Sequence, residues 1–125
     1  MDQAMTDHND SKQWAKRAEI LLASAAGTGQ LITYAGLAEA ARIPGPHRIH
    51  KLTSWLEQLA ALDNQMGQPI RSALVISRSR DGLPAPGFFA HCQMLGLYEG
   101  PESGPQARRF HQSCLSAFSA FQSER

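Results

Sequence analysis

The feature that most constrains the fold is an apolar stripe between residues 47 and 66. Its members step by three, four, three and seven residues: Ile49, Leu52, Leu56, Leu59 and Met66. This spacing places them on one continuous face of an α-helix. Pro46 suits the first turn of such a helix and Gly67 suits its end. The pattern predicts a long helix whose other faces, with His47 and Lys51, are open to solvent or a partner.

Two shorter helical patterns precede this helix. Residues 11–26 repeat apolar side chains at helical spacing, and Gly27-Thr28-Gly29 is expected to end that helix. Residues 31–34 form a short β-prone stretch, and residues 35–42 are rich in alanine and predicted to be helical. Pro44-Gly45-Pro46 ends this second helix, because proline cannot donate a helical hydrogen bond. The second and third helices are therefore joined by a tight turn.

The segment after the long helix resembles the second half of a winged helix-turn-helix in outline. Residues 70–77 are expected to form a buried strand, and Asp81-Gly82 is a strong turn signal. Residues 83–87 contain two prolines and can form at most an edge strand or an irregular return. A short helix over 88–97, a loop over 100–104 and a final helix from Pro105 complete the chain.

Length and composition favour a single domain. The chain has 125 residues, of which 42% are hydrophobic and 18% are charged. We expect one domain over residues 11–125, after a polar, disordered tail at residues 1–10. No apolar run approaches the ~20 residues that span a bilayer, and nothing has the form of a secretory signal. A cytoplasmic protein with no membrane contact and two free thiols, Cys92 and Cys114, is expected.

The net charge of +1 conceals an uneven distribution. Residues 42–80 hold six lysines and arginines but two carboxylates, Glu57 and Asp63. The basic residues are Arg42, Arg48, Lys51, Arg71, Arg78 and Arg80. Such asymmetry can mark a surface for a polyanion, although many domains that bind none share it.

One hexapeptide resembles a known motif. Thr33-Tyr34-Ala35-Gly36-Leu37-Ala38 is similar to the T-Y-x-x-L-A motif in the C-terminal winged-helix domain of O6-alkylguanine-DNA alkyltransferases and their catalytically inactive alkyltransferase-like relatives. The Pro/Gly turn and a helix opening with Arg48-Ile49 are similar too, since the family has Arg-Val there. The likeness covers residues 31–83. It implies that Tyr34 approaches the DNA backbone and that Arg48 lies near the arginine that enters the duplex when a base is flipped out.

The nucleophile of that family has no counterpart in this chain. The family carries Pro-Cys-His-Arg on the strand after the recognition helix, whereas residues 71–76 contain neither cysteine nor histidine. Alkyl transfer needs a thiolate held at the flipped base, and both cysteines lie in later segments. The sequence therefore argues against alkyltransferase activity. Residues 72–89 also resemble the end of small, uncharacterised bacterial proteins with a similar winged-helix pattern.

Three groups of residues are candidates for DNA contact. The helix start offers His47, Arg48, His50 and Lys51 to phosphates and Ser54 to base edges. Tyr34 lies beside them, and Arg78 and Arg80 flank the Asp81-Gly82 turn as a wing tip. Each group also has a purely structural interpretation. The helix start can be a solvated face, and Tyr34 can pack on the third helix. Arg78 and Arg80 can belong to a charged hairpin that protects a sheet edge.

Other kinds of site find less support. Histidine and cysteine, which are zinc ligands, occur in three close pairs, but no spacing motif links the pairs: His47 with His50, His91 with Cys92, and His111 with Cys114. No phosphate-binding loop, HExxH or GxSxG motif is present, and Glu57 and Asp63 are expected on a solvated helix face. No metal or cofactor is predicted.

The Leu83–Phe89 segment has two interpretations. In the first, which we favour, the segment buries its phenylalanines in the core. In the second, it exposes an apolar patch that binds a protein partner or a second copy of the chain. The expected fold is a single α+β domain, mainly helical, with a winged helix-turn-helix core at 31–83 and helices at both ends. The expected function is non-enzymatic binding of double-stranded DNA by a bacterial regulator or DNA-processing accessory. The alternative is a protein-interaction module on the same scaffold.

Overall fold

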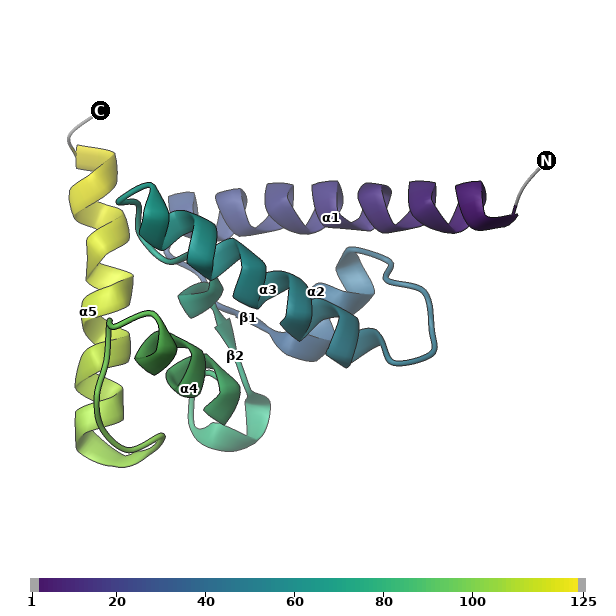
Figure 1. Ribbon diagram of the computed structural model, residues 1–125. Helices are drawn as coiled ribbons and strands as arrows, with labels where there is room; N and C mark the ends of the chain where they lie inside the picture. The colour runs from purple at the N-terminus through teal and green to yellow at the C-terminus, as the bar shows by residue number, and fades with distance from the viewer. Residues whose placement is uncertain (1–2, 124–125) are drawn as a thin grey trace.

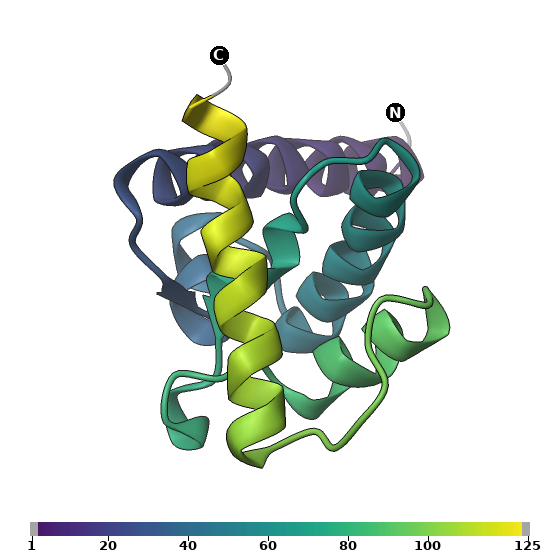
Figure 2. The ribbon, with the colours of Figure 1, turned by 90° about the vertical axis from the view of Figure 1, so that its left-hand side faces the viewer.

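The computed structural model describes residues 3–123, with side chains described for residues 13–120. Its elements, in chain order, are α1 (Gln3–Thr28), β1 (Ile32–Thr33), α2 (Tyr34–Ala40), α3 (Arg48–Gln65), η1 (Arg71–Leu74), β2 (Val75–Ile76), η2 (Arg78–Arg80), α4 (Pro86–Met94) and α5 (Gly104–Ser123), where η denotes a 3₁₀ turn. In Figure 1, α1 lies along the top, α5 stands upright at the left, and α3 runs between them. Figure 2 shows α5 crossing in front of α1, with α3 and α4 beside it at the right. The chain is thus mainly helical, as expected.

The helices predicted from periodicity are confirmed, with shifted boundaries. The long third helix runs from Arg48 to Gln65, and the last helix starts at Gly104. Helix α1 begins at Gln3, inside the segment expected to be a tail, but the side chains of residues 1–12 lie outside the described part. The disordered tail therefore stays a prediction.

The apolar stripe of α3 is buried only in its middle. Leu52, Leu56 and Leu59 are between 0% and 7% exposed. The two ends of the stripe are not part of the core, because Ile49 is 45% exposed and Met66 is 60% exposed. The prediction that this continuous face packs on the core is therefore wrong at both ends.

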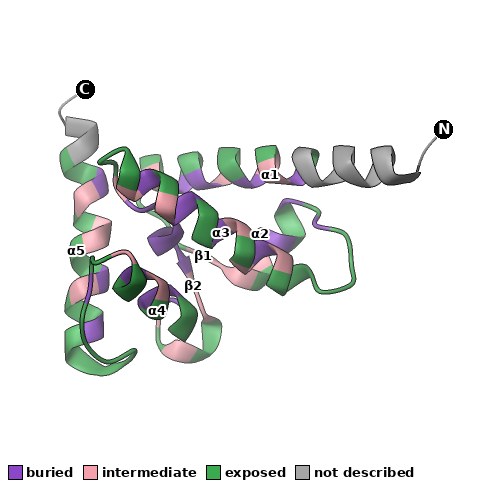
Figure 3. Ribbon diagram, in the orientation of Figure 1, coloured by how far each residue is buried: buried purple, intermediate pink, exposed green. Residues whose placement is uncertain are grey.

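Two clusters of buried side chains form the core, and α3 contributes to both. The first joins α1, α2 and α3, with Trp14, Leu22, Leu37 and Leu52 among its members. The second joins α4 and α5 to the end of α3 and includes Ala60, Phe89 and Tyr98. In Figure 3 the buried residues of α1, α3 and α5 line their inner faces.

The expected strand over residues 70–77 is wrong for most of its length. Residues 71–74 form the 3₁₀ turn η1, and only Val75–Ile76 is extended. This short β2 pairs in parallel with β1, in the register Ile32 with Val75 and Thr33 with Ile76. The partner of β2 is therefore β1, and not the residues after the Asp81-Gly82 turn with which a winged-helix hairpin would pair it.

Residues 77–85 form an irregular loop in place of the expected hairpin. The Asp81-Gly82 turn is confirmed, with left-handed φ values of 54° and 83°. One backbone hydrogen bond, from Ser77 N to Leu83 O at 2.8 Å, closes the loop, and residues 83–85 form no strand. The two prolines of this segment explain the result, because neither can donate to a β-ladder.

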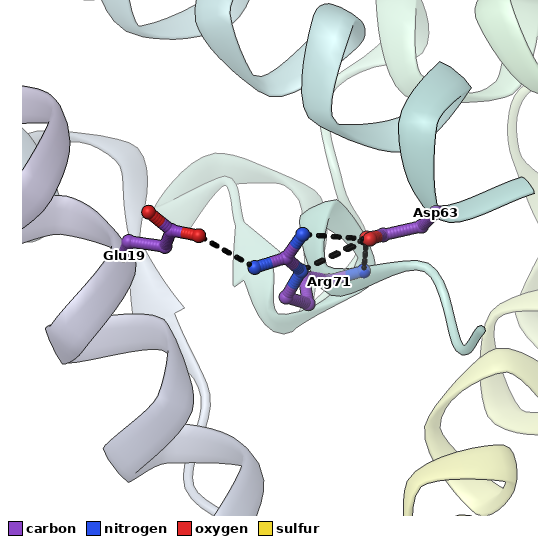
Figure 4. A network of polar contacts seen from close by, with 3 residues as sticks. All are labelled: Glu19, Asp63 and Arg71. Carbon is purple, nitrogen blue, oxygen red and sulfur yellow. Dashed lines mark hydrogen bonds and ion pairs between the residues drawn. The ribbon is translucent and has the colours of Figure 1, made fainter. Parts of the chain in front are cut away.

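A buried ion pair explains why η1 is helical. Both carboxylate oxygens of Asp63 accept from the Arg71 guanidinium, and Oδ2 also accepts the Arg71 backbone N–H at 3.0 Å. Arg71 Nη1 reaches Glu19 Oε2 on α1 at 3.2 Å (Figure 4). The carboxylate therefore satisfies a backbone donor that a strand would place in a ladder. Asp63 is fully buried, so its assignment to a solvated face was wrong, whereas Glu57 is exposed as expected.

The Leu83–Phe89 segment contributes to the core, as the favoured interpretation states. Leu83, Phe88 and Phe89 are 4%, 8% and 1% exposed, and Pro84 is also buried. The alternative, an exposed apolar patch for a partner or a dimer, is contradicted because these large side chains are covered by the second cluster.

Candidate nucleic-acid interface

The connection between α2 and α3 has an unusual backbone. Helix α2 ends in a pair of hydrogen bonds, from Arg42 N to Glu39 O and from Ile43 N to Ala38 O, with Arg42 left-handed at φ 59°. Glycine is the usual residue at the left-handed position that follows a helix C-terminus. It occupies this position after α1, α3 and α4: Gly29, Gly67 and Gly96. His47, which precedes α3, is also left-handed, at φ 64°. Two bulky residues with basic side chains therefore occupy strained positions on either side of Pro44-Gly45-Pro46.

Four cationic side chains surround this connection, and we call Arg17, Arg42, Arg48 and Lys51 the basic turn. Three of them donate to backbone carbonyls: Arg17 Nε to Ala41 O at 2.7 Å, Arg48 Nη2 to Ala38 O at 3.2 Å, and Lys51 Nζ to Pro44 O at 2.9 Å. Carbonyls at a helix C-terminus carry partial negative charge, so these contacts fix the turn. They leave the net positive charge uncompensated, because the ion pairs found among the described residues all involve Arg71.

A groove lies beside the basic turn, and we call it the α3 groove. It has a volume of about 490 Å³. Three segments form most of its walls: residues 33–35, Ile49 and Thr53 of α3, and residues 77–79 around η2; Ala85 completes the lining. The groove therefore brings the predicted contacts Tyr34 and Arg78 together with the start of α3. In Figure 1 these three segments meet below the middle of the view.

Tyr34 forms part of the groove wall and is held in place by its hydroxyl group. The backbone N–H of Ala85 donates to Tyr34 Oη at 3.0 Å, and the half-buried ring packs against the first core cluster. Burial raises the pKa of the Tyr34 hydroxyl above its ordinary value, while the Ala85 hydrogen bond opposes this. The hydroxyl can still donate its own hydrogen to an acceptor such as a phosphate oxygen.

The hexapeptide that contains Tyr34 has a structural explanation in this chain. Thr33 is the N-cap of α2, and its hydroxyl accepts the Gly36 N–H at 3.0 Å. Leu37 and Ala38 are 0% and 2% exposed in the first core cluster. Of the six residues, Thr33, Tyr34 and Ala35 line the groove. The motif therefore identifies a capped, buried helix start, and the part of it available to a ligand is small.

Behind Tyr34 lies a smaller cavity. Its volume is about 40 Å³, and Tyr34, Thr53 and Ala85 line both this cavity and the groove. The Ser72 hydroxyl is buried there and has no hydrogen-bond partner among the described residues. One water needs about 10–15 Å³ of such space, so the cavity has room for a few waters at most.

The two arginines expected at a wing tip differ in their environment. Arg78 is exposed at the rim of the groove, with no hydrogen bond from its side chain to the described residues. Arg80 instead donates to Pro84 O at 2.9 Å and to the backbone carbonyl of Glu102. Arg80 therefore fixes the η2 loop against the start of α5, and Arg78 is the arginine that is free to contact a ligand.

The remaining predicted contacts lie on the start of α3. His47, Arg48, His50 and Ser54 are exposed and Lys51 is half-buried. Four residues of the interface were missed as contacts by the sequence analysis: Arg17, Arg42, Ile49 and Thr53. Ile49 was assigned to the core by its spacing, and Arg17 lies on α1, far away in the sequence. The exposed side chain of Ile49 in the groove has no sequence signal of its own.

The cysteines lie outside this interface, although Cys92 borders the small cavity. Burial raises the pKa of Cys92 to about 12 and that of Cys114 to about 11. Both thiols pack in or against the second core cluster and are therefore protonated at neutral pH. Because the thiolate is the nucleophilic form, neither side chain is activated for group transfer.

The described part of the chain contains neither a metal-binding cluster nor a helix that could span a membrane. Among these residues, no three histidine, cysteine or acidic side chains gather as a metal site. Within the same range, no helix has the length and apolar character that crossing a bilayer requires. Comparison with family models, curated proteins and solved structures finds no match to this chain.

Proposed function

We propose that this chain is a non-enzymatic DNA-binding module of the winged-helix type, related to the alkyltransferase-like proteins. The duplex contacts the basic turn and the α3 groove. Arg42, Arg48 and Lys51 neutralise phosphates, and Tyr34 donates to another. The loop around η2 takes the place of a wing and brings Arg78 to the backbone. Sequence preference comes from the exposed residues of α3, His50 and Ser54 among them.

The observation that carries this proposal is the left-handed backbone at Arg42. A left-handed residue other than glycine costs about 1–2 kcal/mol, and such strain is concentrated at functional sites. Three other helices of this chain end in glycine at the equivalent position. Placing an arginine there, inside a cluster of unpaired cations, favours a role for its charge outside the fold.

Replacing Arg42 by glycine separates binding from folding. We expect Arg42→Gly to raise the free energy of unfolding by about 0.5–1 kcal/mol, because glycine adopts positive φ without strain. The same variant should bind duplex DNA more weakly, and the slope of log K against log salt should fall by about one. Urea unfolding measures the first effect. Fluorescence anisotropy of a labelled 20-base-pair duplex, titrated between 50 and 200 mM salt, measures the second.

Arg109→Ala is the matched control. Arg109 is an exposed arginine near the start of α5. In Figure 1 the start of α5 lies at the lower left, whereas the connection between α2 and α3 lies at the right. This variant should leave both stability and the salt slope unchanged. Loss of binding in a more stable Arg42→Gly protein cannot be ascribed to misfolding. Absence of duplex binding by the unaltered protein at ~50 mM salt would contradict the proposal.

A protein-interaction module is the second candidate, and one observation favours it. A groove of about 400 Å³ lies between the end of α3 and α5. Its lining includes Ile70, Leu97 and Phe110, and Leu97 is 37% exposed. If the unaltered protein fails to bind DNA, substitution of Leu97 by aspartate tests this candidate. The variant should retain its fold and lose whatever self-association or partner binding the native protein shows.

A further inference from the structure

The small cavity behind Tyr34 has mainly apolar walls, which come from α3 and α4. Leu56 and Ala60 lie on α3, and Phe88 and Cys92 lie on α4. All four residues are at most 8% exposed, so the inner part of the cavity is enclosed by the core. A water molecule held in such a place needs about two to four polar partners, so these walls favour an apolar occupant over water.

One polar group in the lining has no partner. Ser72 of η1 is 5% exposed and lines the cavity, and its Oγ forms no hydrogen bond with the described residues. Tyr34 lines the same cavity, and its Oη accepts the Ala85 N–H at 3.0 Å, which leaves the hydroxyl hydrogen available for donation. Because buried hydroxyl groups in folded proteins nearly always have a partner, the unpaired Ser72 hydroxyl points to an occupant that can form a hydrogen bond.

The size and the accessibility of the cavity limit what this occupant can be. The volume of about 40 Å³ accommodates about three or four water-sized groups. Glu57 and Gly87 also belong to the lining and are exposed, so a ligand can enter from solvent. A charged ligand is disfavoured, because none of the buried residues that line the cavity carries a charge that would replace its hydration. The occupant that fits is neutral, small and mainly apolar.

We propose that this cavity is a binding site for a short-chain aliphatic alcohol. The alkyl chain packs against Leu56, Ala60 and Phe88, and the alcohol oxygen forms a hydrogen bond with Ser72 Oγ. An alcohol suits Ser72 in either direction, because both hydroxyl groups donate and accept. The site goes beyond the proposed DNA-binding function, since it requires neither the basic turn nor a nucleic acid.

The test measures the binding of the 1-alcohols from methanol to 1-pentanol to the full chain. Backbone amide NMR shifts suit this purpose, because ligands of this size bind no tighter than the micromolar range. Each additional buried CH₂ group should strengthen binding about fourfold, and the increase should stop near 1-propanol, when the cavity is full. The shifts should saturate and be largest at the amides of residues that line the cavity, such as Ser72, Ala85 and Phe88.

Ser72→Ala tests the hydrogen bond, and Ser54→Ala is its matched control. Ser54 is an exposed serine on α3 that does not line the cavity. Ser72→Ala should bind 1-propanol about fivefold more weakly, because one hydrogen bond is lost, and should keep the increase with chain length. Ser54→Ala should bind every alcohol as the native protein does. Circular dichroism shows whether both variants are folded, which is expected because each substitution removes a single hydroxyl group.

Two results would overturn the assignment. If the shifts do not saturate, or if binding strengthens steadily up to 1-pentanol, the alcohols associate with the surface and the cavity is not a binding site. If Ser72→Ala binds 1-propanol as tightly as the native protein, Ser72 is not the partner of the alcohol oxygen. Neither result bears on DNA binding, because the salt titration of the unaltered protein tests that function separately.

Discussion

The buried hydroxyl of Ser72 is the residue-scale feature that most clearly departs from good packing. It is 5% exposed and has no hydrogen-bond partner among the described residues. An unsatisfied buried hydroxyl costs about 1–3 kcal/mol. Ser72→Ala removes that group and leaves the methylene in place, so the free energy of unfolding should stay constant or rise by up to about 1 kcal/mol.

The hydroxyl of Thr33 provides the opposite case, and urea unfolding of both variants compares them. Thr33 accepts the Gly36 N–H as the N-cap of α2, so Thr33→Ala should lower the free energy of unfolding by about 1 kcal/mol. A loss of that size in Ser72→Ala as well would mean that the Ser72 hydroxyl has a partner, such as a water in the small cavity. The sign of the change therefore reports the state of the cavity.

At the scale of elements, the Asp63–Arg71–Glu19 network fixes η1 between α3 and α1 (Figure 4). The hydrogen bond from Arg71 to Asp63 raises the pKa of Arg71, so the guanidinium stays charged. The side chain of Asp63 is fully buried, whereas that of Glu19 is 53% exposed. Removing one partner of a buried pair leaves an uncompensated charge, which costs about 3–5 kcal/mol.

We therefore expect unequal effects from the two carboxylates. Asp63→Ala should lower the free energy of unfolding by about 3–5 kcal/mol, because it also leaves the Arg71 N–H without its acceptor. Glu19→Gln should lower it by less than about 1 kcal/mol, because the ion pair on that side is open to solvent. Chemical denaturation measures both. Equal losses would show that the buried pair does not dominate the network.

The sequence predicted elements where local pattern determines structure, and failed where a distant residue does. The helical periodicity of residues 48–65 and the turn at Asp81-Gly82 are local signals, and both were confirmed. The strand over 70–77 failed because an apolar run fits a short strand and a buried 3₁₀ turn equally well. The deciding contact comes from Asp63, eight residues earlier, whose burial no local pattern reveals.

In the candidate site, too, local features could be predicted from the sequence, whereas features that depend on distant segments could not. The exposed and basic start of α3 follows from the composition of residues 47–51. The groove does not, because its walls come from three segments that only the folded chain brings together. Ile49 was placed in the core because periodicity identifies a helix face but not the length of helix that its neighbours cover.

At the scale of the whole molecule, the two core clusters meet along η1. Leu74 and Val75 belong to the first cluster, whereas Ile70 and Ala73 belong to the second. His111 on α5 connects to this junction, since its Nε2 lies 2.8 Å from Ala73 O. The imidazole is 4% exposed, and its Nε2–H donates to the carbonyl, because a carbonyl oxygen can only accept. It therefore docks α5 against the segment that carries β2.

The stability of the whole chain should therefore depend on pH through His111. Burial lowers the pKa of His111 below its ordinary value of 6.5; nearby Arg108 lowers it further, while the Ala73 hydrogen bond opposes the shift. Above pH 6.5 the histidine is neutral in both the folded and the unfolded chain, and its contribution is complete. As the pH falls below 6.5, the unfolded chain binds a proton that the folded chain does not. The free energy of unfolding then falls by at most about 1.4 kcal/mol per pH unit.

Urea unfolding at pH 7.5, 6.5, 5.5 and 5.0 measures this dependence above the range in which most carboxylates titrate. His111→Gln should flatten the curve between pH 6.5 and 5.0, whatever its effect on stability at pH 7.5. His50→Gln, which replaces an exposed histidine on α3, should keep the native slope. Because His111 contacts the junction of the two clusters, the loss should appear in one cooperative transition followed equally by tryptophan fluorescence from Trp14 and Trp55 and by circular dichroism. If the two signals separate at pH 5.0, α5 undocks before the first cluster unfolds, and His111 stabilises the docking of α5 rather than the whole fold.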